Sequence, residues 1–371
     1  MEQVGERWRW VVFWVMAMAV GCTGGPEVVG EADRETLDGW LVHEVVEEEV
    51  SFQAGGTEVY GTLTKPQEEV GIPAVVLVAG SGPTDRDWNN PLLPGENGTA
   101  IELSRRLAQA GVGVLRYDKR GTGHTELEGE VVWEDYLSEI EGAVNYVRQR
   151  EEIDGERVVL GGHSEGGIHA LRAVTEGWTE VAGTMLLATP GRSTAVVLEA
   201  QVRQQLEGSG LDEDFIDGEM EGFVGALEAI GARREVDSRE VTQIPGLVSL
   251  LEMLQEERGA RFAAELLRFD PSGAIQEMEG PVLVLAGGKD LQVDAQADGR
   301  RLAEAGEQAG VALRFRVAEE ADHVLKYQPI PRENLNEQHG LSYNDPSRRL
   351  DEGVLQVMVE WLREEVMGEE G

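Results

Sequence analysis

The chain has 371 residues, enough for one large α/β domain with an insertion or for two domains. Its formal net charge of −38 at pH 7 arises from 70 acidic against 32 basic side chains, and such a surface repels nucleic acid and anionic lipid headgroups. Binding to a phosphate backbone is therefore excluded, and the acidity has two open explanations, adaptation to high salt or a heavily solvated acidic face.

The first 22 residues have the pattern of a bacterial export signal. Arg7 and Arg9 precede an apolar run over 10–20, which is too short to span a bilayer but typical of a signal peptide. The single cysteine, Cys22, follows Ala19-Val20-Gly21, so we expect a lipoprotein signal with Cys22 as the lipidated residue. This signal predicts an exported bacterial protein that is anchored to a membrane and lies in the periplasm or on the outer surface. A plainly cleaved signal and an uncleaved anchor are the alternatives.

Beyond this signal, residues 23–40 begin as a glycine-rich, acidic stretch and predict a flexible tether. From residue 41 the chain alternates strand and helix patterns, which indicates an α/β fold with a mostly parallel sheet wrapped by helices. The expected strands are a hairpin over 47–65 and runs at 73–80, 112–117, 158–161, 183–189, 281–286 and 313–317, and the expected helices are 99–110, 133–147 and 350–362.

Between residues 191 and 280 the strand pattern stops, and three helix patterns appear near 194–206, 213–230 and 247–267. We expect a helical cap over the carboxyl ends of the strands, inserted between core segments 41–190 and 281–371. Five apolar side chains of this cap are candidates for an acyl or leaving-group pocket, with ordinary packing as the simpler explanation: Phe215, Met220, Phe223, Leu247 and Leu251.

The most informative segment is 158–167, where an apolar strand runs directly into Gly-x-Ser-x-Gly and then into a helix pattern. This is the context of a nucleophile elbow, whose serine lies on a strained strand-to-helix turn with its hydroxyl above the sheet. Gly162 and Gly166 lack the Cβ atoms that would clash in such a turn. We expect Ser164 to be a nucleophile and the backbone N–H of Glu165 to be one donor of its oxyanion hole.

A serine nucleophile needs a histidine base and an acid that orients the imidazole. Four histidines are unsuited by their place in the chain: His43, His124, His163 and His169. Of the remaining two, His323 follows the last expected strand, whereas His339 lies farther on. Asp290 ends the preceding strand, so the order Ser164, Asp290, His323 is that of an α/β-hydrolase. Asp322 is a spare acid, but adjacent to His323 it is badly placed to reach the imidazole.

The second oxyanion donor is expected in the loop after the strand over 73–80. Ser81 is the first choice for this backbone N–H and Gly82 the second. The following triplet, Asp85-Arg86-Asp87, is a candidate substrate clamp, with a local salt bridge that holds the loop as the simpler explanation. Residues 117–123 are glycine-rich but lack the spacing of a phosphate-binding loop, so we interpret them as a tight structural turn.

Six segments of the chain together resemble the bacterial α/β-hydrolases related to esterase EstD and to the serine aminopeptidase-like group. They lie at 80–87, 115–123, 162–167, 269–271, 288–293 and 322–326, and the resemblance extends over about residues 45–365. It implies the α/β-hydrolase fold and a carboxylic ester hydrolase whose catalytic triad is Ser164, Asp290 and His323.

These patterns together predict a serine esterase that acts on a small-molecule ester through an acyl-enzyme and needs no metal or organic cofactor. A peptidase, such as an aminopeptidase, or a thioesterase would use the same three residues. A ligand-binding module of the same fold without turnover is a further alternative, since a fold by itself does not determine function. The sequence makes no prediction about oligomeric state.

Overall fold

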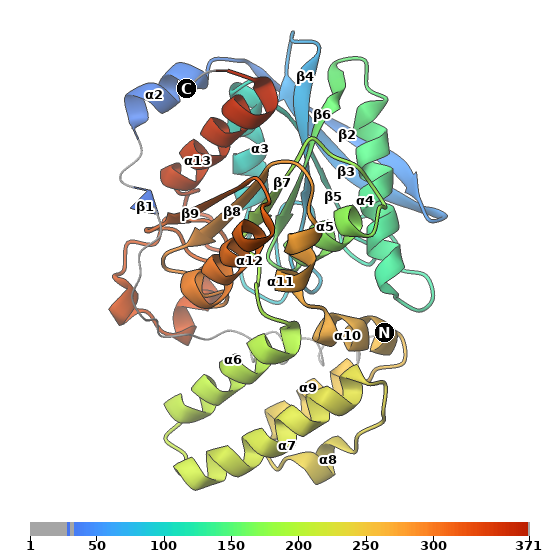
Figure 1. Cartoon of the computed structure of the whole chain (residues 1–371), viewed down its shortest axis with the longest axis vertical. Coiled ribbons are helices and arrows are strands. Elements are labelled where there is room, and N and C mark those ends of the chain that lie inside the picture. The colour runs from blue at the N-terminus through green and yellow to red at the C-terminus, as the bar shows by residue number, and fades with distance from the viewer. Residues whose placement is uncertain (1–27, 30–32, 370–371) are drawn as a thin grey trace.

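The computed structural model of the protein describes residues 28–29 and 33–369, and its centre is one twisted sheet (Figure 1). The predicted export signal and Cys22 lie outside the described residues. The sheet has the order β1-β9-β8-β7-β6-β4-β5-β3-β2, in which β3 runs antiparallel to both its neighbours and all other pairs are parallel. Its strands are β1 (Val28–Val29), β2 (Val45–Ala54), β3 (Thr57–Pro66), β4 (Ile72–Val78), β5 (Gly113–Tyr117), β6 (Ile153–His163), β7 (Gly183–Leu187), β8 (Val282–Gly287) and β9 (Leu313–Ala318).

Helices cover both faces of this sheet, which explains why the central strands are almost continuously apolar. Every residue of β4, β5, β7 and β8 is buried. One face packs against α3 (Thr99–Gln109) and α13 (Glu352–Leu362), and the other against α4 (Trp133–Arg148), α5 (Glu165–Thr175) and α12 (Arg301–Ala309). The predicted α/β fold with a mostly parallel sheet is confirmed.

The prediction of a flexible tether over 23–40 is wrong for the residues that the structure describes. Strand β1 adds to the sheet edge, with Val28 opposite Val317 and Val29 opposite Ala318. Helix α2 (Arg34–Trp40) follows, begun by the Asp33 side chain, which accepts from the Thr36 amide. Leu37 of this helix is buried in the same core as α3 and α13. A two-residue strand and a two-turn helix gain their order from these contacts, and short patterns of this kind are weak in the sequence.

The insertion after β7 consists of helices and connecting loops, without a strand in its described residues, and forms a layer below the sheet in Figure 1. Its helices are α6 (Thr194–Gly208), α7 (Glu213–Gly231), α8 (Ser238–Val241), α9 (Pro245–Leu254) and α10 (Ala260–Arg268). The single helix expected at 247–267 is divided in two, because the polar segment 255–259 ends α9 and Gly259 begins α10. Within the described residues, no helix has the length and apolar character needed to cross a membrane.

The last part of the expected insertion belongs to the core. Helix α11 (Pro271–Ala274) and turn η1 (Ile275–Glu277) bring Ile275 and Met278 against β8 and α12. The hydroxyl of Ser272 donates to the Gly191 carbonyl at 2.6 Å, which joins the entry and exit of the insertion. The boundary expected at residue 280 therefore lies about ten residues earlier. The remaining short elements are the π-helices η2 (Ala295–Arg300) and η5 (Arg363–Met367) and the 3₁₀ helices η3 (Arg332–Asn334) and η4 (Glu337–Ser342).

Candidate active site

Ser164 occupies a strained turn between β6 and α5. Its φ of 54° and ψ of −123° are unfavourable for a residue with a Cβ atom, so surrounding contacts must hold this conformation. The Ser164 amide donates to the Leu187 carbonyl at 2.8 Å, and its carbonyl accepts from the Gly167 amide at 2.9 Å. A Cβ atom on Gly162 would collide with the backbone of Gly166, so the turn requires glycine there. The hydroxyl consequently lies at the start of α5 and at the carboxyl end of β6.

Asp290 and His323 form a hydrogen-bonded pair beside this turn. The His323 Nδ1 lies 2.8 Å from the Asp290 Oδ2, and both side chains are buried. The other carboxylate oxygen of Asp290 accepts from the amides of Gln292 and Val293 at 2.7 and 2.9 Å. Because a carboxylate only accepts, His323 Nδ1 carries the proton, and in the neutral ring Nε2 is then the basic atom.

Asp322, the alternative acid in the sequence, binds other groups than the His323 imidazole. Its Oδ1 accepts from the amides of Val324 and Lys326 at 3.1 and 3.0 Å, and its Oδ2 pairs with Arg348 at 2.6 Å. Burial raises the pKa of Asp322, although the nearby Arg348 opposes that shift. Asp322 thus shapes the loop that carries His323, while Asp290 is the acid that meets the imidazole.

The loop after β4 lies directly against Ser164. A Cβ atom on Gly80 would lie 3.3 Å from the Ser164 Cβ, so the Gly80–Ser81 peptide borders the serine. Within the described residues, the backbone amides of Ser81 and Glu165 donate to no protein group. Glu165 is the first residue of α5, where helix amides lack partners and the helix dipole favours negative charge. The ammonium of Lys119, at the end of β5, donates to the Gly80 carbonyl on the far side of this peptide.

The triplet 85–87 holds this loop to the sheet. Arg86 donates to the Asp118 carboxylate through Nε at 3.1 Å and Nη2 at 2.8 Å, and its backbone amide donates there at 2.9 Å. Asp87 pairs with Arg116 at 2.7 Å. Asp85 accepts the amides of Asp87 and Asn89, and burial raises its pKa. These residues are structural, and the substrate-clamp hypothesis finds no support in their contacts.

His163, which precedes the nucleophile and is not the predicted base, contacts two other segments of the site. The Nε2 of His163 donates to the His323 backbone carbonyl at 2.7 Å, and its ring stacks on Trp88 with centroids 4.3 Å apart. Burial, and then the nearby His323, lower the pKa of His163 to about 3, so the ring is neutral at physiological pH. No pattern in the sequence indicated this role, because both partners are distant in the chain.

Neither His169 nor His339 contacts Asp290. His169 is buried on α5, stacks on Tyr136 at 4.9 Å and lies 3.4 Å from the Glu165 carboxylate. Burial lowers its pKa, although the Glu165 carboxylate opposes that shift. His339 lies in η4, where its Nδ1 is 3.1 Å from the Asn336 carbonyl.

Four of the five apolar cap residues proposed as pocket-lining instead form the interior of the insertion. Met220, Phe223, Leu247 and Leu251 are each 1% exposed or less and pack in one cluster with one another. Phe215 is 39% exposed and lies outside that cluster. A helix layer that must fold as an extra unit needs its own apolar core, and these side chains provide it. The pocket hypothesis for the four buried residues is wrong.

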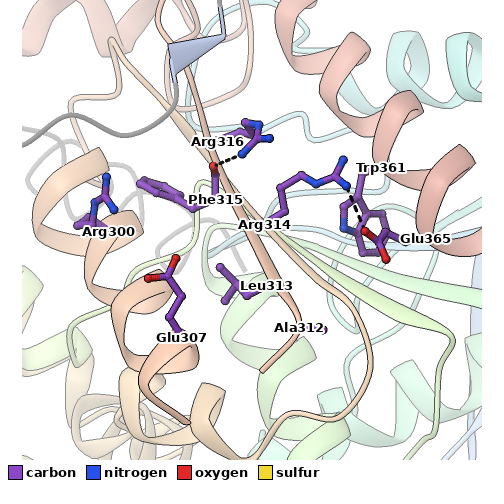
Figure 2. A pocket seen from close by; sticks show the side chains of 9 residues that line it. All are labelled: Arg300, Glu307, Ala312, Leu313, Arg314, Phe315, Arg316, Trp361 and Glu365. Carbon is purple, nitrogen blue, oxygen red and sulfur yellow. Dashed lines mark hydrogen bonds and ion pairs between the residues drawn. The ribbon is translucent and has the colours of Figure 1, made fainter. Parts of the chain in front are cut away.

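A hollow of about 530 Å³ lies along β9 (Figure 2). Arg300, Arg314 and Arg316 line it together with Phe315 and Trp361. Figure 2 shows Arg314 directed toward Glu365, to which it donates at 3.1 Å. None of the predicted site residues lines this hollow. Across the described part of the chain, no three His, Cys, Asp or Glu side chains are grouped so that they could hold a metal ion.

Comparisons with known proteins agree with this architecture. The model of the alpha/beta hydrolase family matches residues 75–329. Esterase EstD of Thermotoga maritima is 29% identical over 240 residues, which are 63% of this chain and 50% of EstD. The chain thus spans half the length of that curated relative.

Solved structures share the fold at low sequence identity. The carboxylesterase EstE1 from a metagenomic library has a TM-score of 0.51 and 17% identity, covering 89% of this chain and 93% of EstE1. An acylaminoacyl peptidase of Pyrococcus horikoshii has a TM-score of 0.52 and 14% identity, covering 92% of this chain and 45% of the peptidase. The fold class and the resemblance to EstD predicted from the sequence are both confirmed.

Proposed function

The chain belongs to the alpha/beta hydrolase family, and on this premise we propose that it is a serine hydrolase that cleaves carboxylic esters. One observation carries the proposal. A histidine held by a buried carboxylate, His323 Nδ1 to Asp290 Oδ2 at 2.8 Å, lies at the same sheet edge as a serine strained into an elbow. Such strain persists at sites where the conformation has a function. EstD, a relative over 240 residues, is named an esterase and supports the choice of ester over other acyl compounds.

In the proposed reaction, Ser164 attacks the ester carbonyl while the Nε2 of His323 accepts the hydroxyl proton. Asp290 holds the imidazole in the required tautomer and stabilises the imidazolium that forms. The amides of Glu165 and Ser81 donate to the oxygen that becomes negatively charged. His323 then protonates the leaving alcohol, and water repeats the sequence on the acyl-enzyme to release the acid. Each step uses side chains and amides of this chain.

The test is hydrolysis of p-nitrophenyl esters from acetate to palmitate by the purified protein and by Ser164→Ala, at low and at high salt. Turnover that the substitution reduces by at least about 10³-fold supports the proposal, because removal of the nucleophile leaves only the residual effect of the oxyanion hole. The chain length with the highest kcat/KM then defines the acyl pocket.

Two further substrate classes separate the alternatives. Aminoacyl p-nitroanilides test peptidase activity, and acyl thioesters test thioesterase activity. A kcat/KM for either that exceeds the value for every ester overturns the ester assignment but keeps the triad. Folded protein that hydrolyses none of the three classes overturns the enzyme assignment altogether and leaves ligand binding as the function of the fold.

We also propose that the protein is exported and anchored through lipid on Cys22. The motif that ends at Cys22 supports this proposal. Mass spectrometry of the membrane fraction tests it: diacylglyceryl mass on Cys22 is expected, and Cys22→Ala should release the protein into the soluble fraction.

A further inference from the structure

Lys119 is a buried cation at the rear of the proposed oxyanion loop. Its ammonium donates to the Gly80 carbonyl and lies 3.4 Å from the Gly82 carbonyl. The side chain is 3% exposed, and in the described part of the chain no carboxylate oxygen lies within 4.0 Å of the ammonium. The positive charge therefore has backbone carbonyls of this loop as its hydrogen-bond partners.

The Gly80 carbonyl and the Ser81 N–H belong to the same peptide group. Resonance joins the two ends of a peptide, so a cation at the oxygen draws electron density from the nitrogen and strengthens the N–H as a donor. We propose that Lys119 is a positioning residue of the oxyanion hole: it fixes and polarises the Gly80–Ser81 peptide so that the Ser81 N–H stabilises the transition state. The inference rests on the proposed function and deepens it.

The surroundings of Lys119 agree with a role in charge stabilisation. Burial lowers the pKa of Lys119, while the carboxylates of Glu165 and Glu139 oppose that shift from a greater distance. A buried cation without a contacting anion is costly in the ground state, and a negative charge that develops nearby offsets that cost. In its protonated form, Lys119 places a positive charge behind the Gly80–Ser81 peptide before the ester binds.

The lysine is also held in place from its own backbone. The amide and the hydroxyl of Thr122 both donate to the Lys119 carbonyl, at 2.9 and 2.7 Å. The preceding residue, Asp118, is bound by Arg86 of the oxyanion loop. The turn over 117–123 predicted as structural therefore joins the two loops and delivers the ammonium to the Gly80 carbonyl.

Two substitutions separate the charge of Lys119 from its hydrogen bond. Lys119→Met removes both, and we expect kcat for the best ester to fall by about 10²-fold with KM within threefold, as for loss of an oxyanion donor. Lys119→Gln retains an N–H donor without the charge, and its kcat should lie between those of Lys119→Met and the wild type. The control is Lys65→Met, because Lys65 pairs with Glu152 at 3.0 Å remote from this loop and should leave kcat unchanged.

A trifluoromethyl ketone distinguishes this role from a general structural one. The ketone forms a negatively charged adduct on the nucleophilic serine, whereas the corresponding alcohol binds without charge. Lys119→Met should lower the affinity for the ketone by the same factor by which it lowers kcat/KM, and it should leave the affinity for the alcohol unchanged. A folded variant with kcat within threefold of the wild type, or with equal losses for ketone and alcohol, overturns the inference.

A measurement on the wild-type protein remains if both variants fail to fold. The chain has four lysines, Lys65, Lys119, Lys289 and Lys326, so ¹³Cε-labelled lysine gives few signals to assign. The titratable groups that face Lys119 are the carboxylates of Glu165 and Glu139, the imidazoles of His163 and His169, and the phenol of Tyr136.

These groups are present both in the free protein and in the ketone adduct. Formation of the adduct should therefore move the titration of Lys119 to higher pH and leave the titration of Lys65 unchanged. An identical Lys119 titration in the free protein and the adduct contradicts the inference. If the wild-type protein shows no ester hydrolysis that Ser164→Ala abolishes, the proposed function itself fails. That result is distinguishable from failure of the Lys119 inference, which requires an active wild-type protein.

Discussion

The imidazole of His163 donates a hydrogen bond to the backbone carbonyl of His323 at 2.7 Å. The residue that precedes the proposed nucleophile thus holds the loop that carries the proposed base. The other side of this ring is covered by Trp88, stacked with centroids 4.3 Å apart. The contact joins the elbow after β6 to the loop after β9, so it fixes the relative position of two elements on which catalysis depends.

Replacement of His163 by phenylalanine tests this contact. His163→Phe keeps a ring against Trp88 but leaves the buried His323 carbonyl without its donor, which should lower the free energy of unfolding by about 1–3 kcal/mol. Because the loop that carries His323 loses this hydrogen bond, the substitution should also lower kcat more than it raises KM. Urea denaturation and ester kinetics measure the two effects. His124→Phe, at an exposed position in the turn after β5, is the control and should change stability by less than about 0.5 kcal/mol. Wild-type stability in His163→Phe would contradict the prediction.

Stability should fall in mildly acidic solution because of two buried histidines. Burial lowers the pKa of His163 from 6.5 to about 3 and also lowers that of His169. Below pH 6.5 the unfolded chain binds protons that these folded rings do not, so the stability present above pH 6.5 is lost as the pH falls. Two such groups give a slope of up to about 2.7 kcal/mol per pH unit.

Urea denaturation between pH 7 and pH 4.5 measures this slope before most carboxylates titrate. In His163→Phe about half of it should disappear, since one of the two rings no longer binds a proton on unfolding. A slope that is unchanged by the substitution would show that other groups produce the pH dependence.

Asp290 and Asp322 should respond differently to the same substitution. Asp290→Asn removes the acceptor that fixes the His323 tautomer and should lower kcat by about 10⁴-fold. Asp322→Asn keeps an oxygen for the amides of Val324 and Lys326 but loses the pair with Arg348. We expect it to lower the unfolding temperature and to change kcat by less than tenfold. Comparable losses of kcat in the two folded variants would contradict the assignment of Asp290.

Gly80→Ala should impair catalysis through steric contact. The added Cβ would lie 3.2 Å from the His163 Nδ1 and 3.3 Å from the Ser164 Cβ, so the loop must shift by a few tenths of an ångström. That shift moves the Ser81 amide and should lower kcat by about 10-fold to 100-fold. Gly208→Ala is the control, since nothing lies within 4 Å of a Cβ at that end of α6. Equal kcat values for the two variants would exclude the Gly80–Ser81 peptide from the oxyanion hole.

The net charge of −38 predicts a protein that salt stabilises. Repulsion among exposed carboxylates destabilises the folded state, and the screening length decreases from about 10 Å at 0.1 M to about 3 Å at 1 M salt. The unfolding temperature should rise from 0.1 to 2 M in both NaCl and KCl. A constant or falling temperature would favour a solvated acidic face over adaptation to high salt.

The sequence predicted the core of this fold well because its signals are local. Uniformly apolar runs mark the doubly covered strands, and glycines with a serine between them mark the turn after β6. Chain order also placed Asp290 and His323 after neighbouring strands, and the structure joins them by a hydrogen bond. The contacts of Lys119 and His163 were beyond prediction, because they depend on how separate loops meet in space. Strand β1 was missed since two valines carry no periodicity.

The pairing of Val28 and Val29 with β9 has a consequence for membrane attachment. With lipid on Cys22, the proposed anchor is followed by only residues 23–27 before the chain joins the sheet. A fully extended stretch of that length spans at most about 20 Å. The β9 edge would then stay within about 20 Å of the lipid surface, about a third of the distance that an extended chain of eighteen residues could span. The anchored protein would then present its β9 side to the bilayer at a distance set by this short segment.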